Sequence, residues 1–301
     1  MNAVVRLAHD VSAGALGWLH ANHGLGGFED DATADLDDPD GVYKPVAELA
    51  LAASLVLREG VAGTAELRAA RELMGYAWAQ LREGDLLYER QLRHAVLTDP
   101  LETYAPHARG GLRHEALEQL LDRASAADAL IEVLPNRRLA VANAHRVVGT
   151  RRDDDFPAML RQTWLGRTTQ PWAIDWYTAY CMTHTVFHIT DWSALPGGLP
   201  PDVVEYLGNW LPVWCEVWAE AGQWDLLGEL LVVGACLPEP WCDRTTWEVF
   251  ARAQHADGFV PRDAEPVDDD PRQRFLGHQH TAVVATIAGT LTVSRLLGGG
   301  R

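Results

Sequence analysis

The chain has 301 residues, of which 48% are hydrophobic and 22% are charged, proportions that are typical of a globular protein and not of a disordered one. Acidic residues outnumber basic residues by 42 to 25 and give a net charge of -17, which argues against nucleic acid or an anionic membrane surface as the main partner. No apolar run is long enough to predict a transmembrane helix, and the N-terminus has no signal-peptide pattern, so the sequence predicts a cytoplasmic protein without membrane insertion.

Nearly every segment has the composition of a helix, because Ala, Leu, Glu and Arg are abundant and alternating strand patterns are missing. In chain order, we expect helices at residues 2–22, 43–59, 64–82, 99–108, 113–124, 138–149, 155–166, 171–191, 201–221, 223–235, 240–255 and 279–296. The connections are short except for two acidic loops, and no linker or change of composition divides the chain. We therefore expect an all-α fold in a single domain over residues 1–301.

The two ends of the chain carry copies of one pattern, at residues 18–57 and 247–291. Each copy has an amphipathic helix, a Gly-Phe turn, an acidic loop and a helix rich in small residues that opens near Tyr43 or Gln279. Repeated helical hairpins stack to bury a shared core. With about twelve helices in all, the pattern predicts an α/α toroid of about six hairpins, closed where the two copies meet.

The pattern of a Trp, a polar pair, Gly-Phe and then an aromatic residue or His at the next helix resembles the α/α-toroid superfamily. That superfamily includes terpenoid cyclases, protein prenyltransferase β-subunits and lanthionine-forming cyclases. The run Gln279-His280-Thr281, followed by small apolar residues, resembles the segment that carries a zinc-ligand histidine in prenyltransferase β-subunits. These resemblances cover only the two ends of the chain and imply a toroid fold and a cyclase or lyase activity. The whole chain also resembles an actinobacterial family of similar length, which implies no function.

The helix expected at residues 171–191 carries the most informative pattern. His184 and His188 are four residues apart and Asp191 is three further on, so the three side chains share one face of an otherwise apolar helix. Tyr177 and Tyr180 extend that face upstream. Two histidines at this spacing can share one metal ion, and a carboxylate can complete or orient the set. The alternative is a core helix whose polar side chains pair with neighbouring helices.

His280 is a third candidate ligand, on the prenyltransferase resemblance more than on spacing. If the toroid closes, residues that open the inner helices share one end of the cavity, and His280 then meets His184 and His188. Three protein ligands and an open fourth position are what a catalytic zinc ion needs. We therefore predict zinc as the cofactor, with a capping or core role for His280 as the alternative.

Further polar and aromatic residues are candidates for the chemistry. We predict catalytic roles for Asp175, Tyr180 and Asp191. The substrate contacts that we predict come from four residues: Trp176, Tyr177, Tyr104 and Arg137. The guanidinium of Arg137 suits a carboxylate or phosphate, with an ion pair to a nearby acid as the alternative. For the aromatic residues the alternative is a place in the hydrophobic core, because buried aromatic side chains commonly form core.

The string Asp35-Leu36-Asp37-Asp38 spells the acidic motif of proton-initiated terpene cyclases. In those enzymes an aspartic acid that its neighbours keep protonated transfers its proton to an alkene. Here the string lies in an acid-rich loop, and the alternative is a solvated loop without a catalytic role.

The leading hypothesis is a metal-dependent cyclase or lyase of bacterial specialised metabolism that acts on a modified peptide or a small apolar substrate in a toroid cavity. Two alternatives stay open. The first is a metal-free cyclase of the terpenoid type that uses an aspartic acid, and the second is a non-enzymatic helical module that binds a peptide or a partner protein. The sequence does not specify the oligomeric state. It lacks the P-loop, the Rossmann glycine motif and the Gly-x-Ser-x-Gly motif, which argues against the corresponding enzyme classes.

Overall fold

The computed structural model describes residues 3–29, 32–35, 39–124 and 134–298. The described residues form helices joined by turns and loops, and none of them lies in a strand. The all-α fold class is therefore confirmed, whereas the assignment to the toroid superfamily remains a prediction.

The α-helices are α1 (Ala3–Asn22), α2 (Pro39–Glu59), α3 (Thr64–Gln80), α4 (Asp85–Arg93), α5 (Asp99–Arg109), α6 (Glu115–Ala124), α7 (Pro135–Val148), α8 (Phe156–Leu160), α9 (Trp176–Ile189), α10 (Pro201–Glu220), α11 (Trp224–Cys236), α12 (Arg244–Ala253) and α13 (Pro271–Leu297). Short 3₁₀ helices cover His23–Gly26, Arg82–Gly84, Leu165–Arg167 and Pro196–Gly198.

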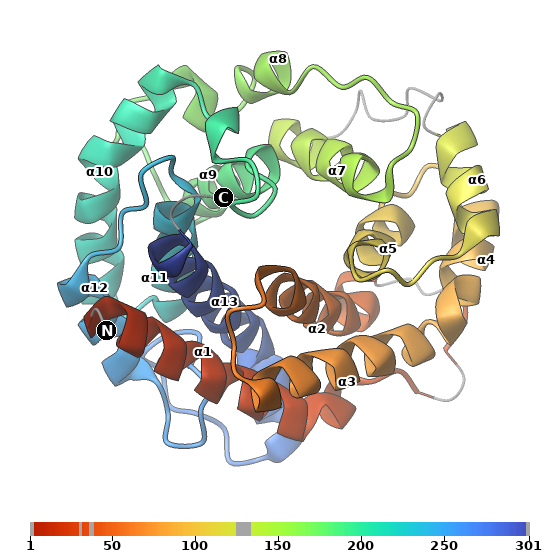
Figure 1. The fold of residues 1–301 in the computed structure, drawn as a ribbon, viewed down its shortest axis with the longest axis horizontal. Helices are drawn as coiled ribbons and strands as arrows, with labels where there is room; N and C mark the ends of the chain where they lie inside the picture. The colour runs from red at the N-terminus through yellow and green to blue at the C-terminus, as the bar shows by residue number, and fades with distance from the viewer. Residues whose placement is uncertain (1–2, 30–31, 36–38, 125–133, 299–301) are drawn as a thin grey trace.

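Six of the described helices form a closed inner ring (Figure 1). Each of them contacts the next in the order α2, α5, α7, α9, α11 and α13, and α13 contacts α2 to complete the circle. The remaining α-helices lie around the outside of this ring (Figure 1). The helices α11 and α13 are apolar over most of their circumference, as expected of helices that are covered on several sides.

The inner helices run in the same direction, so their C-terminal ends gather at one end of the ring. Arg58 at the end of α2 donates hydrogen bonds to the carbonyls of Asp191 and Trp192, which follow α9. Ser294, near the end of α13, donates to the Glu59 carboxylate at the end of α2, and Arg295 donates to the carbonyl of Leu237 directly after α11. The opposite end of the ring is therefore built from the N-terminal halves of the inner helices.

The two terminal repeats meet where the ring closes. The Gln279 side chain in α13 donates a hydrogen bond of 3.0 Å to the carbonyl of Pro45 in α2. This contact confirms the prediction that the helices near Tyr43 and Gln279 are neighbours. The outer helix α1 packs on α13, and Gly289 of α13 lies so near α1 that an added Cβ would sit 2.2 Å from the Ala8 carbonyl oxygen.

The helix α13 is long and apolar enough to cross a membrane by length and composition, and it is the one described helix of that kind. In its candidate window 72% of the residues are buried inside the protein, as in the core helix of a soluble protein.

The helix α13 begins at Pro271 and not near residue 279, because the Asp270 carboxylate caps it by accepting a 2.9 Å hydrogen bond from the Gln273 amide.

Candidate functional site

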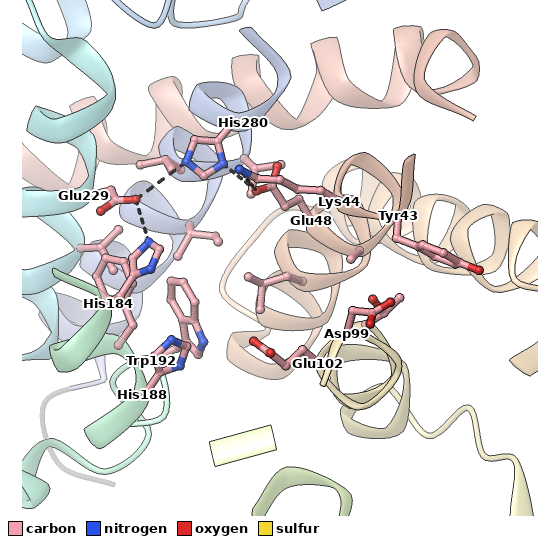
Figure 2. A pocket seen from close by; sticks show the side chains of 18 of the residues that line it. Tyr43, Lys44, Glu48, Asp99, Glu102, His184, His188, Trp192, Glu229 and His280 are labelled. Carbon is pink, nitrogen blue, oxygen red and sulfur yellow. Dashed lines mark hydrogen bonds and ion pairs between the residues drawn. The ribbon is translucent and has the colours of Figure 1, made fainter. Parts of the chain in front are cut away.

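A cavity of about 300 Å³ lies inside the ring, and every inner helix contributes to its wall (Figure 2). This volume is at the lower end of the range for small-molecule sites. The Lys44 and Arg137 side chains at the N-terminal ends of α2 and α7 are about half exposed, so the cavity opens at this end, which we call the mouth. The wall further from the mouth is apolar and includes Leu51, Phe187, Val232, Val284 and Ile287.

Glu229 of α11 is the centre of a polar cluster on the cavity wall (Figure 2). Its Oε1 atom lies 3.3 Å from Nε2 of His184 and 3.8 Å from Nε2 of His280. Only 1% of the Glu229 side chain is exposed. Burial alone raises the pKa of a carboxyl group, but the two histidines outweigh burial here and lower the pKa of Glu229 to about 2. Glu229 is therefore a carboxylate at neutral pH.

His280 of α13 links Glu229 to two further acids. Its Nδ1 atom lies 2.7 Å from Oε1 of Glu48, and its Nε2 atom lies 3.6 Å from Oδ2 of Asp225. Burial works to lower the pKa of His280, but Glu48 and then Asp225 outweigh burial and raise this pKa well above its ordinary value. The ring of His280 is therefore held as a cation in the absence of any bound ion.

Asp225, one turn before Glu229 on α11, is a buried acid beside Tyr180. It accepts hydrogen bonds of 2.6 Å from the Tyr180 hydroxyl and 3.0 Å from the Thr281 hydroxyl. Burial raises the pKa of Asp225, and the positive charge of His280 only partly offsets this rise. A second cation beside Asp225 would stabilise its charged form further.

These donors can hold a metal ion. One ligand atom from each of Asp225, Glu229 and His280 lies within 4.8 Å of the other two. In the described part of the chain, this is the one group of three or more His, Cys, Asp or Glu side chains whose ligand atoms come so close together. Carboxylate oxygens and imidazole nitrogens are ligands of zinc and of other first-row divalent metals. The donor chemistry therefore fits a divalent cation, with His184 directly beside the group through Glu229.

The three predicted zinc ligands are only partly brought together. His184 and His280 approach the same oxygen of Glu229, so their Nε2 atoms cannot be further apart than the sum of those two distances. His188 also lines the cavity, but it does not belong to the group of donors. Its Nδ1 atom is buried without a hydrogen-bond partner among the described residues, and burial holds the pKa of His188 well below its ordinary value. His188 is thus a neutral residue beyond the polar cluster.

Two other predicted residues lie at or beside the cavity. Arg137 lines it and donates a 2.5 Å hydrogen bond to Glu102, the ion pair that the alternative interpretation describes. Tyr180 reaches the site through its bond to Asp225.

The structure does not bring Asp175, Trp176 or Tyr177 to the cavity wall. The Asp175 carboxylate caps α9 by accepting a 2.7 Å hydrogen bond from the Thr178 amide, and Trp176 and Tyr177 are 61% and 50% exposed. Tyr104 is fully buried outside the cavity, where it donates to Glu118 and accepts from the His114 amide. These four predicted residues therefore lie outside the lining of the cavity.

Asp191 also differs from its predicted place. The helix α9 ends at Ile189, so Asp191 leaves the face that carries His184 and turns toward Arg109 and Asn143, which both donate to its Oδ1 atom. In the acidic string, residues 36–38 lie outside the described part of the chain. Asp35 lies within it and pairs with Arg93 and His94 on the surface.

The acidic members of the cluster are not among the residues predicted from the sequence. Asp225 and Glu229 are four residues apart on a helix that is otherwise apolar, so they share one face of it. Like charges at this spacing repel each other in a buried helix unless cations neutralise them. That pairing is a sequence signal that could have identified both residues.

The family DUF6895, described as a domain of unknown function, matches residues 12–290, and the chain therefore belongs to this family. No curated protein and no solved structure matches the chain.

Proposed function

We propose that this protein is a metal-dependent enzyme, a cyclase or lyase of specialised metabolism, whose reaction takes place at the polar cluster inside the ring. The observation that carries the proposal is the convergence of Asp225, Glu229 and His280 within 4.8 Å on or beside the wall of a cavity. The closed ring of inner helices supports the toroid assignment, and that resemblance is the source of the reaction class. We place the protein in the cytoplasm as part of the same proposal.

Asp225, Glu229 and His280 would hold the ion, with zinc as the first candidate. A bound divalent cation supplies Lewis acidity and lowers the pKa of a bound water or thiol. Zinc sites of the catalytic kind commonly combine histidine with carboxylate ligands and leave one position open.

The chain's own groups would perform the remaining tasks. His184 is 38% exposed at its side chain and is held by Glu229, so it is the group placed to exchange a proton with a substrate. Glu48 orients the His280 ring through its bond to Nδ1, the role that outer carboxylates commonly have beside ligating histidines. The apolar wall excludes water from the rest of the cavity, and its volume of about 300 Å³ fits a small molecule or one side chain of a peptide.

The proposal is tested by measuring metal in the purified protein and the thermal shift on adding zinc to chelator-treated protein. We expect about one ion per chain and a higher melting temperature with zinc, because an ion that binds only the folded state stabilises it. Glu229→Gln removes one ligand and should abolish both effects, whereas Glu248→Gln, a change in an exposed ion pair of α12, should retain them. Identical metal content and thermal shift in the two variants would reject the proposed centre.

The non-enzymatic alternative makes a different prediction in the same experiment. A binding module without metal gives no ion in the purified protein and no thermal shift with zinc, in the unmodified chain as in both variants. That outcome would favour the two metal-free alternatives, a role in binding a peptide or a partner and a cyclase of the terpenoid type.

A further inference from the structure

Trp192 lines the cavity just beyond the C-terminal end of α9, on a turn with an unusual backbone. Asp191, Trp192 and Ser193 follow one another with φ angles of 44°, 52° and 69°. A non-glycine residue is strained in this left-handed region, and such a conformation persists only where its surroundings over-determine it. Three in succession therefore mark a turn that neighbouring groups fix in place.

Arginines from the C-terminal ends of three inner helices fix this turn. Arg58 of α2 donates to the carbonyl of Asp191 at 2.9 Å and to the carbonyl of Trp192 at 2.5 Å. Arg109 of α5 donates to the Asp191 carboxylate, and Arg146 of α7 donates to the carbonyl of His188 at 2.8 Å. Their side chains are largely buried at this end: those of Arg58 and Arg109 are 20% and 11% exposed.

The turn holds the Trp192 indole against the apolar part of the cavity. The ring stacks on Phe187 with centroids 4.5 Å apart. It also lies nearly perpendicular to the ring of His188, with centroids 6.4 Å apart, and Figure 2 shows the two side chains together. Both of these residues line the cavity with Trp192. The charged groups His280 and Glu48 lie at the other end, near the mouth. A molecule whose polar end contacts His280 would therefore extend its apolar part toward Trp192.

We infer that Trp192 is a specificity-determining residue that sets the length of the apolar chain the cavity accepts, and that Asp191 with its arginine partners positions it. This inference rests on the proposed function only in taking the cavity as the binding site, and it needs neither the metal ion nor the reaction. An indole is the largest side chain available at such a position, so its removal lengthens the apolar space without altering the polar cluster.

The test uses straight-chain 1-alkanols of increasing length as probes, with binding measured by calorimetry on chelator-treated full-length protein. For the unmodified chain, we expect affinity to rise about four-fold with each methylene until the chain reaches Trp192, and then to stop rising. In Trp192→Ala, the rise should continue for several further carbons. Asp191→Asn weakens the bond to Arg109. It should also increase the alkanol length at which affinity stops rising, by fewer carbons than Trp192→Ala.

Trp172→Ala is the matched control, because this tryptophan is 76% exposed and does not line the cavity. In this variant, affinity should stop rising at the same alkanol length as in the unmodified chain. Should Trp192→Ala fail to fold by circular dichroism, Trp192→Phe gives a smaller lengthening in a less disruptive variant. An unchanged limit in the folded Trp192 variants, or alkanol binding without any dependence on chain length, overturns the inference. A lengthened limit in a protein that binds no zinc keeps the inference and rejects the metal-dependent function.

Discussion

His280 and Glu48 join the last inner helix to the first, with Nδ1 of the imidazole 2.7 Å from Oε1 of the carboxylate. The same imidazole faces Asp225 and Glu229 with its other nitrogen. The closure of the ring and the assembly of the candidate centre therefore depend on the same side chain. A change in how α2 and α13 pack would displace a ligand of the proposed ion.

Glu48→Gln should weaken zinc binding without removing any of the three ligands. The amide cannot accept from the imidazole as a charged carboxylate does, so the ring of His280 is less firmly oriented and less basic. Loss of such an outer partner typically lowers metal affinity about 10–100-fold. Competition with a chromogenic chelator measures this change, and Glu72→Gln, at a surface position of α3, provides the control. Equal affinities in the two variants would show that Glu48 has no orienting role.

A buried histidine on α5 predicts a loss of stability in mild acid. Burial lowers the pKa of His107 to about 4, although its hydrogen bond to the Thr103 carbonyl opposes this. Between this pH and the unfolded pKa of about 6.5, the unfolded chain binds more protons, so the free energy of unfolding falls as the pH falls. The full decrease in the free energy of unfolding that His107 causes is about 3 kcal/mol.

Urea unfolding at pH 7 and pH 5 measures this dependence, and His107→Gln should reduce it because glutamine does not titrate. His94→Gln, in which the replaced ring is exposed, should leave the dependence as it is. A pH dependence that is the same in both variants would mean that other groups produce it, of which His145 is the first candidate because burial lowers its pKa to about 4 as well.

Sequence periodicity was sufficient to predict most of the helices, because each buries an apolar stripe that repeats with the helical period. The helix α4 was missed, since its nine residues, Asp85–Arg93, include four charged groups and give a weak stripe. Its Arg90 is nevertheless buried and pairs with Asp99 at 2.5 Å. Such a pairing depends on a contact between two helices and has no local signature in the sequence.

The candidate site was predictable only in part, for a related reason. The spacing of His184 and His188 placed both on one helix face, and both do line the cavity. Which of them approaches the acidic group depends on where α11 lies beside α9, and that is fixed by packing. Asp191 was misplaced because periodicity extends a helix past its actual end, whereas a turn with positive φ angles removes the residue from the helix face.

His188→Leu should leave the bound metal unchanged, since His188 lies outside the group of donors. Stability should be equal or higher, because the change removes a buried nitrogen that has no hydrogen-bond partner in the part of the chain that the structure describes. His280→Gln is the contrasting variant, in which the metal should be lost. Elemental analysis of both proteins measures the bound metal, and their melting temperatures in the presence of chelator measure the stability of the metal-free fold. Loss of metal from His188→Leu would restore the set of three histidines as the ligands.

The packing of α1 against α13 should be sensitive to a single methyl group. In Gly289→Ala, the new Cβ would lie 2.2 Å from the Ala8 carbonyl oxygen and 2.6 Å from Cβ of Ser12, so the two helices must separate. Overpacking of this kind costs about 1–3 kcal/mol. Gly277 lies in the same helix, and none of the described neighbouring residues comes within 4 Å of an added Cβ. Gly277→Ala should therefore stabilise the protein by about 0.5–1 kcal/mol through the higher helix propensity of alanine. Chemical unfolding of both variants compares the same substitution in the same helix. Opposite signs are expected because only Gly289 touches a neighbouring backbone, and a Gly289→Ala variant as stable as Gly277→Ala would mean that α1 and α13 are not packed this closely.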